Sequence, residues 1–229
     1  MLVSQFRGDL SLLLPAMLPV LAMLLVLGSC APEPSRLSPD GADPAAPAAS
    51  DSETVAAAAS QPAPPSVDID ALERRIHDRV NALRTARGRP ALRWDAQYHP
   101  LARSHSRDMA AQSFFSHVNP SGQDVNDRAA ELGLECRVAT SETTQNIGFA
   151  ENLYTAHLYQ SHRVTKAPDG TVVDQTYDWK SPDAMAQEVV QGWLDSPGHR
   201  QNLLHPQYHA ESIGVTVEGR TYYVTQVFC

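Results

Sequence analysis

Three separate segments of the sequence combine loop-forming residues with ionisable side chains, and they hold the best candidates for chemistry. The segments are 115–122 (Phe-Ser-His-Val-Asn-Pro-Ser-Gly), 150–153 (Ala-Glu-Asn-Leu) and 196–204 (Ser-Pro-Gly-His-Arg-Gln-Asn-Leu-Leu). Their key groups are His117, Glu151 and His199, and such side chains can act as acids, bases or metal ligands. The separations of 34 and 48 residues are too long for a local metal motif. Only the fold could bring these three side chains together.

Composition and missing motifs exclude several function classes. The chain has 229 residues with 26 acidic and 18 basic side chains, and its formal charge of -8 argues against a protein that grips nucleic acid through summed positive charge. It also has no P-loop, Gly-x-Gly-x-x-Gly turn, Gly-x-Ser-x-Gly elbow or His-Glu-x-x-His helix. Nucleotide binding and several hydrolase classes therefore lose most of their support.

Other histidines have simpler interpretations than a site. His105 falls on the apolar face of a predicted helix, so we interpret it as a core residue. His205 and His209 are four residues apart, but a proline lies between them, which favours a turn with exposed histidines. His157 and His162 are five residues apart, a spacing that would make them diverge on a helix.

The first 66 residues predict export and membrane attachment. An apolar run from Leu10 to Leu27 follows Arg7 and closes on Leu-Gly-Ser-Cys, which resembles a bacterial lipobox. We therefore expect residues 1–29 to be a lipoprotein signal peptide and Cys30 to carry the lipid. An uncleaved membrane anchor with a chance cysteine is the alternative. Residues 30–66 are rich in Pro and Ala and cannot pack a core, which is typical of an extended tether.

Residues 67–229 form a single predicted domain of helices followed by a hairpin. Their charge is mild, with 16 basic and 20 acidic groups, so no polybasic membrane patch is expected. We expect helices from an Asp68 cap to Gly88, up to about Gln112, from Val125 to Leu132, and from Ser181 to before Pro197, with hairpins turning at Asp169-Gly170 and Gly219-Arg220. A lone hairpin is marginal in water, so the second one needs a further strand, which we place near 134–138.

The order of several motifs carries a resemblance to a known family. The motifs are Val80-Asn81-Ala82-Leu83-Arg84, the segment 115–122, Glu151-Asn152-Leu153, the segment 192–204, Ile213-Gly214-Val215 and Thr225-Gln226-Val227-Phe228. The chain resembles the CAP superfamily, also called SCP, and in particular its branch of bacterial secreted proteins and lipoproteins. This resemblance implies an α/β fold, an α-β-α sandwich with a central antiparallel sheet, and a broad cleft lined by histidines and acidic residues.

The resemblance assigns His117, Glu151 and His199 to that cleft. Eukaryotic members take the second cleft histidine from a segment in which this chain has Tyr223, and their second cleft glutamate corresponds to Ser196 here. The triplet Gln145-Asn146-Ile147 is an alternative match to the Glu-Asn motif, and it would leave no carboxylate.

Two readings of these three residues stay open. His117 and His199 could bind zinc or another divalent metal, with Glu151 as a third ligand or a general base. Alternatively, the three could hydrogen-bond one another and only hold the cleft in shape. If Ser196 caps a short helix, the helix dipole keeps His199 neutral at pH 7.

The cysteine pattern predicts one disulfide. With Cys30 lipidated, Cys136 and Cys229 remain as an even pair in an oxidising compartment. Two free buried thiols are the alternative.

The leader predicts an extracytoplasmic protein of the cell envelope that meets the lipid membrane through a Cys30 anchor, and three functions remain for such a protein. The first is binding of a lipid, sterol, glycan or peptide in the cleft. The second is metal-dependent peptide hydrolysis, and the third is a structural or adhesive role.

Overall fold

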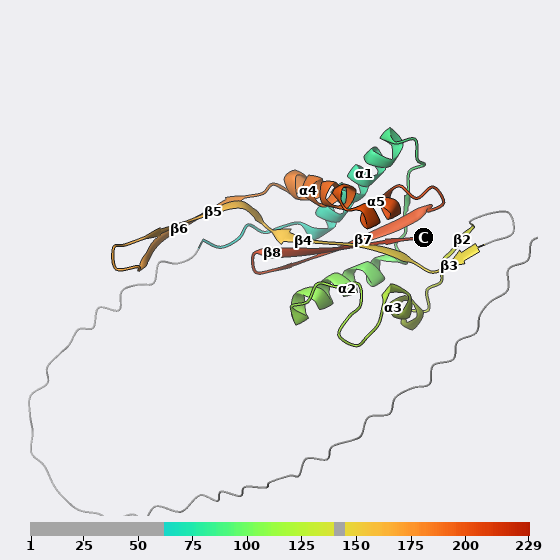
Figure 1. Cartoon of the computed structure of the whole chain (residues 1–229), viewed down its shortest axis with the longest axis horizontal. Helices are drawn as coiled ribbons and strands as arrows, with labels where there is room; N and C mark the ends of the chain where they lie inside the picture. Colours follow the sequence, from blue (N-terminus) through green and yellow to red (C-terminus); the bar gives the residue numbers. More distant parts are fainter. Residues whose placement is uncertain (1–61, 140–144) are drawn as a thin grey trace, which may run out of the picture. The chain divides into compact units, whose positions relative to one another are not determined.

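The computed structural model of the protein describes residues 62–139 and 145–229 (Figure 1). The predicted leader 1–29, the lipidation site Cys30 and the tether up to residue 61 lie outside these residues. In the described part the helices are α1 (Ile69–Ala86), α2 (His99–Gln112), α3 (Val125–Glu131), α4 (Pro182–Asp195) and α5 (Pro197–Leu203). The strands there are β1 (Arg93–Trp94), β2 (Arg137–Ala139), β3 (Gln145–Ile147), β4 (Ala150–His157), β5 (Tyr159–Lys166), β6 (Val172–Trp179), β7 (Ala210–Glu218) and β8 (Thr221–Phe228). None of the described helices is long and apolar enough to cross a membrane.

The predicted helix starts are confirmed by their caps. The Asp68 side chain accepts from Ala71 N at the start of α1, and Ser181 does the same for Ala184 N at the start of α4. At α3, Asp124 forms a reciprocal capping box. Each cap satisfies backbone N–H groups that have no partner inside the helix.

Four strands form the central sheet in the order β1-β7-β8-β4. The predicted hairpin is confirmed as β7 and β8, and β4 pairs antiparallel with β8 over its whole length. The short β1 pairs with β7 in parallel. The sheet is therefore mostly, not wholly, antiparallel, and β1 and β4 are its two edges.

The prediction that residues 134–138 supply the third strand is wrong. Residues 137–139 form β2, which pairs with β3 in a separate two-stranded sheet. The hairpin instead pairs with β4, whose polar residues Glu151 and Asn152 hide the apolar alternation that normally indicates a strand.

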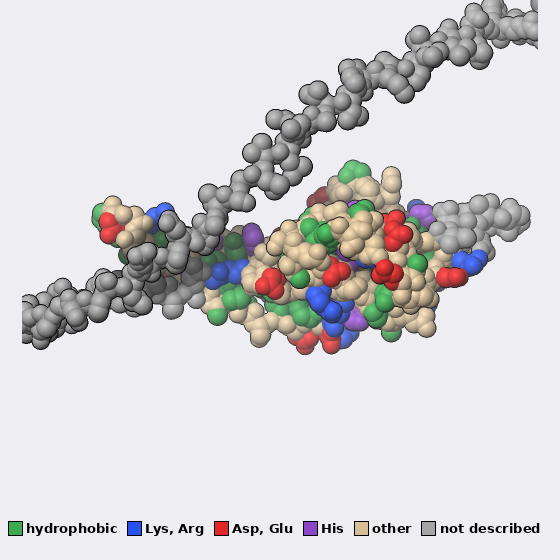
Figure 2. Space-filling model, turned by 90° about the horizontal axis from the view of Figure 1, so that it is seen from below, with side chains coloured by type: hydrophobic (Ala, Val, Ile, Leu, Met, Phe, Trp, Pro, Cys, Tyr) green, Lys and Arg blue, Asp and Glu red, His purple; other side chains and the backbone are tan. Residues whose placement is uncertain are grey.

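Helices cover both faces of the central sheet, with α1, α4 and α5 on one face and α2 and α3 on the other (Figure 1). A core cluster on the first face contains Leu72, Ile76 and Trp193, all fully buried. A smaller cluster on the second face contains Leu101 and Cys136. On the face that carries α2 and α3, acidic and basic side chains are intermingled (Figure 2).

Gly214 in β7 lies where α2 packs most closely on the sheet. A Cβ at this position would lie 2.3 Å from Arg103 N and 2.4 Å from Ala102 C, which are backbone atoms that cannot swing away. We expect Gly214→Ala to lower the free energy of unfolding by about 3 kcal/mol, as severe overpacking does. Urea denaturation of the purified protein measures this loss. Gly219→Ala is the comparison: a Cβ there meets no atom, so its effect comes from the positive φ alone. A Gly214→Ala protein as stable as the wild type would contradict the close contact.

The other predicted hairpin, which turns at Asp169-Gly170, is confirmed as β5 and β6. Its strands carry a row of stacked rings, in which Tyr177 lies 4.2 Å from His162 and 4.8 Å from Trp179 between centroids. The assumption that His157 and His162 lie on a helix is wrong, because they belong to β4 and β5. Cross-strand stacking stabilises this two-stranded element, which would be marginal by itself.

Candidate functional site

His117 lies in the loop that follows α2, and a buried histidine fixes this loop. Ser113 ends α2 in the left-handed conformation at φ 55°, which turns the chain back. The fully buried His105 lies 2.9 Å through Nε2 from the carbonyl of Ser116. A carbonyl only accepts, so His105 Nε2 carries the proton and donates it. The interpretation of His105 as a core residue is confirmed, and it also anchors the residue next to His117.

Arg128 from α3 connects the same loop to the sheet. Its side chain is 6% exposed, and Nη1 donates to the carbonyl of His117 at 2.9 Å. The other terminal nitrogen, Nη2, donates to Glu151 Oε2 at 2.5 Å. No short motif marks Arg128 in the sequence, and sequence reasoning missed it.

Glu151 on the edge strand β4 is the centre of the cluster. Its side chain is 2% exposed, and its two oxygens are taken by Arg128 and by His117 Nδ1, the latter at 2.9 Å. Since a carboxylate only accepts, His117 donates through Nδ1, and Nε2 of the neutral ring is left as an acceptor. The His117 side chain is 52% exposed, so this acceptor belongs to an accessible ring.

His199 meets His117 from the opposite layer. It lies in α5, and the two imidazole centroids are 6.0 Å apart. Tyr223, by contrast, pairs with Thr155 farther along β4. The structure therefore brings His117, Glu151 and His199 together from a loop, a strand and a helix.

The pKa of His199 is lowered, but not for the predicted reason. Burial lowers it first, and nearby His117 lowers it further through charge repulsion when both rings are protonated. Ser196 occupies the N-cap position of α5, yet its side chain makes no capping hydrogen bond. The predicted cap is therefore wrong in this respect, while the direction of the pKa shift is as expected.

A chain of hydrogen-bonded side-chain amides, two of them buried, supports the site from the interior. Asn202 Nδ2 donates to the carbonyl of Glu151 at 3.2 Å and to Asn152 Oδ1 at 3.0 Å. Asn152 Nδ2 in turn donates to the carbonyl of His199 at 3.2 Å and to Gln226 Oε1 at 3.1 Å. Gln226 Nε2 donates to Glu211 at 2.5 Å. We call Asn202, Asn152, Gln226 and Glu211 the amide relay.

The carboxylate at the far end gives the amide relay its direction. Glu211 is fully buried and can only accept hydrogen bonds, so Gln226 must present its nitrogen there and its oxygen to Asn152. His77 Nδ1 donates a hydrogen bond to the other oxygen of Glu211, Oε1, at 2.6 Å. The sequence motifs contain Asn152, Asn202 and Gln226, but nothing in their spacing indicates that they contact one another.

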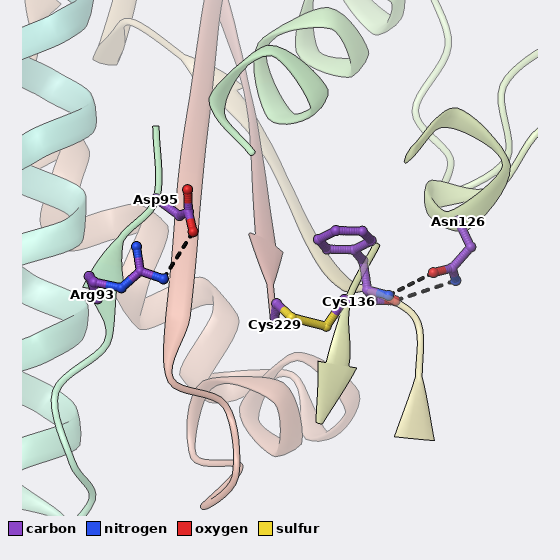
Figure 3. Close-up of a disulfide and its surroundings, with 6 residues drawn as sticks. Arg93, Asp95, Asn126, Cys136 and Cys229 are labelled. Atoms are coloured by element: carbon purple, nitrogen blue, oxygen red, sulfur yellow. Dashed lines mark hydrogen bonds and ion pairs between the residues drawn. A yellow bond between two sulfur atoms is a disulfide. The ribbon is translucent and has the colours of Figure 1, made fainter. Parts of the chain in front are cut away.

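The predicted disulfide between Cys136 and Cys229 is present, with Cα atoms 5.6 Å apart (Figure 3). Beside it, Asn126 Oδ1 accepts from Phe149 N at 2.6 Å, just before β4 begins. The bridge and this hydrogen bond fasten the segments that lead into the strand carrying Glu151. Between His205 and His209 the chain forms the predicted turn, and His209 is exposed as expected, but His205 is partly buried and stacks on Tyr208.

The donor set does not fit a metal centre with three protein ligands. Within residues 62–139 and 145–229, no three His, Cys, Asp or Glu side chains are grouped so that they could hold a metal ion. At the site itself, the oxygens of Glu151 are already engaged by Arg128 and His117. Catalytic zinc sites normally use three protein ligands. We therefore derive no step through a metal.

The link between the two site histidines gives a testable pH effect. Because part of the lowering of the His199 pKa comes from His117, we expect His117→Asn to raise it towards the ordinary value of 6.5. The pKa of His199 is lower in the folded protein than in the unfolded chain. As the pH falls below 6.5, the unfolded chain therefore binds the proton more readily, and His199 lowers the free energy of unfolding. An NMR titration of the imidazole C–H signals measures the pKa, and urea denaturation at several pH values below 7 measures the stability. An unchanged His199 titration in the variant would contradict the predicted coupling.

Comparisons with known proteins find a matching family model and similar bacterial proteins. The model of the cysteine-rich secretory protein family, CAP, matches residues 77–228. The uncharacterized membrane protein YlbC of Bacillus subtilis (strain 168) is 29% identical over 156 residues, which are 68% of this chain and 34% of that protein. The uncharacterized protein YkwD of the same organism is 24% identical over 151 residues, 66% of this chain and 45% of that protein. This chain thus spans less than half the length of either relative.

A solved structure is also similar, that of an extracellular protein containing a SCP domain from Bacillus anthracis str. Ames. It is 26% identical, covers 72% of this chain and 44% of its own, and superposes with a TM-score of 0.45. The family model alone spans most of the described domain, from α1 to the end of β8, and includes all three site residues. The chain belongs to the CAP family.

Proposed function

We propose that this chain is an extracytoplasmic CAP lipoprotein that binds a ligand between His117 and His199. The observation that carries the proposal is the half-exposed His117 ring, which the buried Glu151 and Arg128 hold beside His199. Binding sites need a few polar groups with fixed orientation, and fixing them before the ligand arrives lowers the entropic cost of binding. His117 Nε2 suits a ligand with a hydroxyl or N–H donor, as found on lipid head groups, sterols, glycans and peptides.

The cell-envelope location rests on three observations. The leader and the Leu-Gly-Ser-Cys sequence favour export and lipidation of Cys30. A disulfide suits an oxidising compartment. One relative is named a membrane protein and the solved structure is named an extracellular protein. A labelled fatty acid supplied to the cells should be incorporated into the wild type and not into Cys30→Ser; a wild type that takes up no label would indicate an uncleaved anchor instead.

A binding panel of lipids, sterols, glycans and peptides tests the site at His117 and His199 on the full-length protein. We expect one class to bind the wild type and to bind His117→Asn and His199→Asn at least about tenfold more weakly, as lost hydrogen bonds to a ligand do. His209→Asn is the matched control, because His209 is exposed and outside the cluster. Equal binding by all four proteins would refute a ligand site at these histidines.

The orientation of His117 by a carboxylate also occurs in metal and acid–base sites. This observation keeps a metal-dependent peptidase as the second candidate, in which zinc would have only two protein ligands, His117 and His199, in place of the usual three. Metal content and peptide-library cleavage of the wild type and the double histidine variant decide it. A third outcome would support the structural or adhesive role. In that case His117→Asn and His199→Asn change neither ligand binding nor peptide cleavage, but each lowers the melting temperature.

A further inference from the structure

A cavity lies at the opposite edge of the sheet from His117. The clustered histidines sit at the β4 edge, whereas this cavity of about 470 Å³ opens at β1, between α1 and the start of α2. Its volume falls within the usual range for small-molecule sites, about 300–1,000 Å³. The features that matter for its chemistry are Trp94 and the polar side chains around it.

Two buried carboxylates fix the walls of the cavity. Glu73 is 2% exposed and accepts hydrogen bonds from Arg103, from His99 Nε2 at 2.9 Å and from the backbone N of Val215. On the other side, Glu211 holds His77. Both histidines are thereby kept in one orientation without a ligand.

The two imidazoles flank the indole of Trp94. Ring centroids lie 5.5 Å from Trp94 to His77 and 5.4 Å from Trp94 to His99. Trp94 is only partly buried, and it is the one apolar side chain that lines the cavity. A fixed aromatic group surrounded by hydrogen-bonding groups is the result.

Free charges of both signs complete the rim. Arg74 and Asp78 are exposed, lie four residues apart on α1, and make no hydrogen bond or ion pair within the described part of the chain. The rim therefore offers donors and acceptors together. A lipid tail would find one apolar side chain, and a polyanion would face the carboxylates of Asp70 and Asp78.

We propose that this cavity binds a sugar, as a free mono- or disaccharide or as a unit of a glycan. One face of a pyranose ring consists largely of C–H bonds and packs on an indole, and its hydroxyls both donate and accept hydrogen bonds. Trp94 supplies the aromatic surface, Arg74 donates, Asp78 accepts, and the imidazoles of His77 and His99 border the ring. The site is independent of the ligand proposed for His117.

The test is an NMR titration of the full-length protein with glucose, galactose, N-acetylglucosamine and chitobiose, followed through the indole N–H signal of Trp94. We expect at least one of these sugars to shift that signal in a saturable manner while glycerol does not. Arg74→Gln combined with Asp78→Asn should weaken the binding about tenfold, since two hydrogen bonds are lost. Arg163→Gln with Asp174→Asn, two exposed charges of the β5–β6 hairpin, is the matched control.

Two further results separate this proposal from the ligand site proposed at His117 and His199. His117→Asn should leave the sugar-induced shift unchanged, and a sugar that shifts His117 but not Trp94 would assign it to the other site. If no sugar of the panel moves the Trp94 signal, or if the Arg74/Asp78 variant binds as tightly as the wild type, the sugar site is refuted.

Discussion

Glu151→Ala is expected to lower the free energy of unfolding by about 4 kcal/mol, the usual cost of removing one partner of a buried ion pair. The loss comes mainly from Arg128, whose guanidinium is 6% exposed and would remain buried without its carboxylate. The change also frees His117 Nδ1, so the loop after α2 loses a second fastening point. Urea denaturation monitored by circular dichroism measures the effect.

A double variant distinguishes this cause from general damage to β4. Replacing both partners, as in Glu151→Leu with Arg128→Met, leaves no buried charge, so the double variant should be more stable than Glu151→Ala. A loss below about 1 kcal/mol for Glu151→Ala would mean that the pair behaves like an exposed ion pair. The burial of Glu151 described above would then be wrong.

Cys229→Ser is expected to cost about 4 kcal/mol. The bridge joins residues 93 positions apart, and closing a loop of that size removes much of the entropy of the unfolded chain. Both cysteines are buried, and Cys229 also exchanges backbone hydrogen bonds with Ala210 of β7. The serine variant therefore also loses packing at the end of the sheet.

Thermal melts with and without reductant provide the measurement. Reduced wild-type protein should melt close to the Cys229→Ser variant, since both lack the bridge. The control is the oxidised variant, whose melting temperature should not respond to reductant. A wild-type melting temperature that reductant leaves unchanged would show that the bridge does not form in the purified protein.

Local chemistry made the helices and both hairpins predictable. The caps at Asp68, Asp124 and Ser181 and the turn at Gly219 act over a few residues, so the sequence displays them directly. β4 was missed because Glu151 and Asn152 interrupt the apolar pattern, and their polarity is satisfied only by residues far away in the chain.

The site was predictable only in part, for the same physical reason. His117, Glu151 and His199 could be assigned through the family resemblance, and the structure places them together. Arg128 and Glu211 carry no sequence signal, because an arginine on a helix is normally exposed and a buried glutamate is rare. Their roles follow from tertiary packing, which brings α3 to the β4 edge and places Gln226 beside Glu211.

The amide relay makes the interior of this domain sensitive to the difference between one nitrogen and one oxygen. Asn152→Asp keeps the size and shape of the side chain, yet it would turn an acceptor towards Gln226 Oε1 and towards the carbonyl of His199, which both need a donor. Deamidation at this position would do the same without any change in the gene. Shape complementarity alone therefore does not specify this core. A change from Asn152 to Asp, which leaves the packing volume the same, would weaken the attachment of the helix that carries His199.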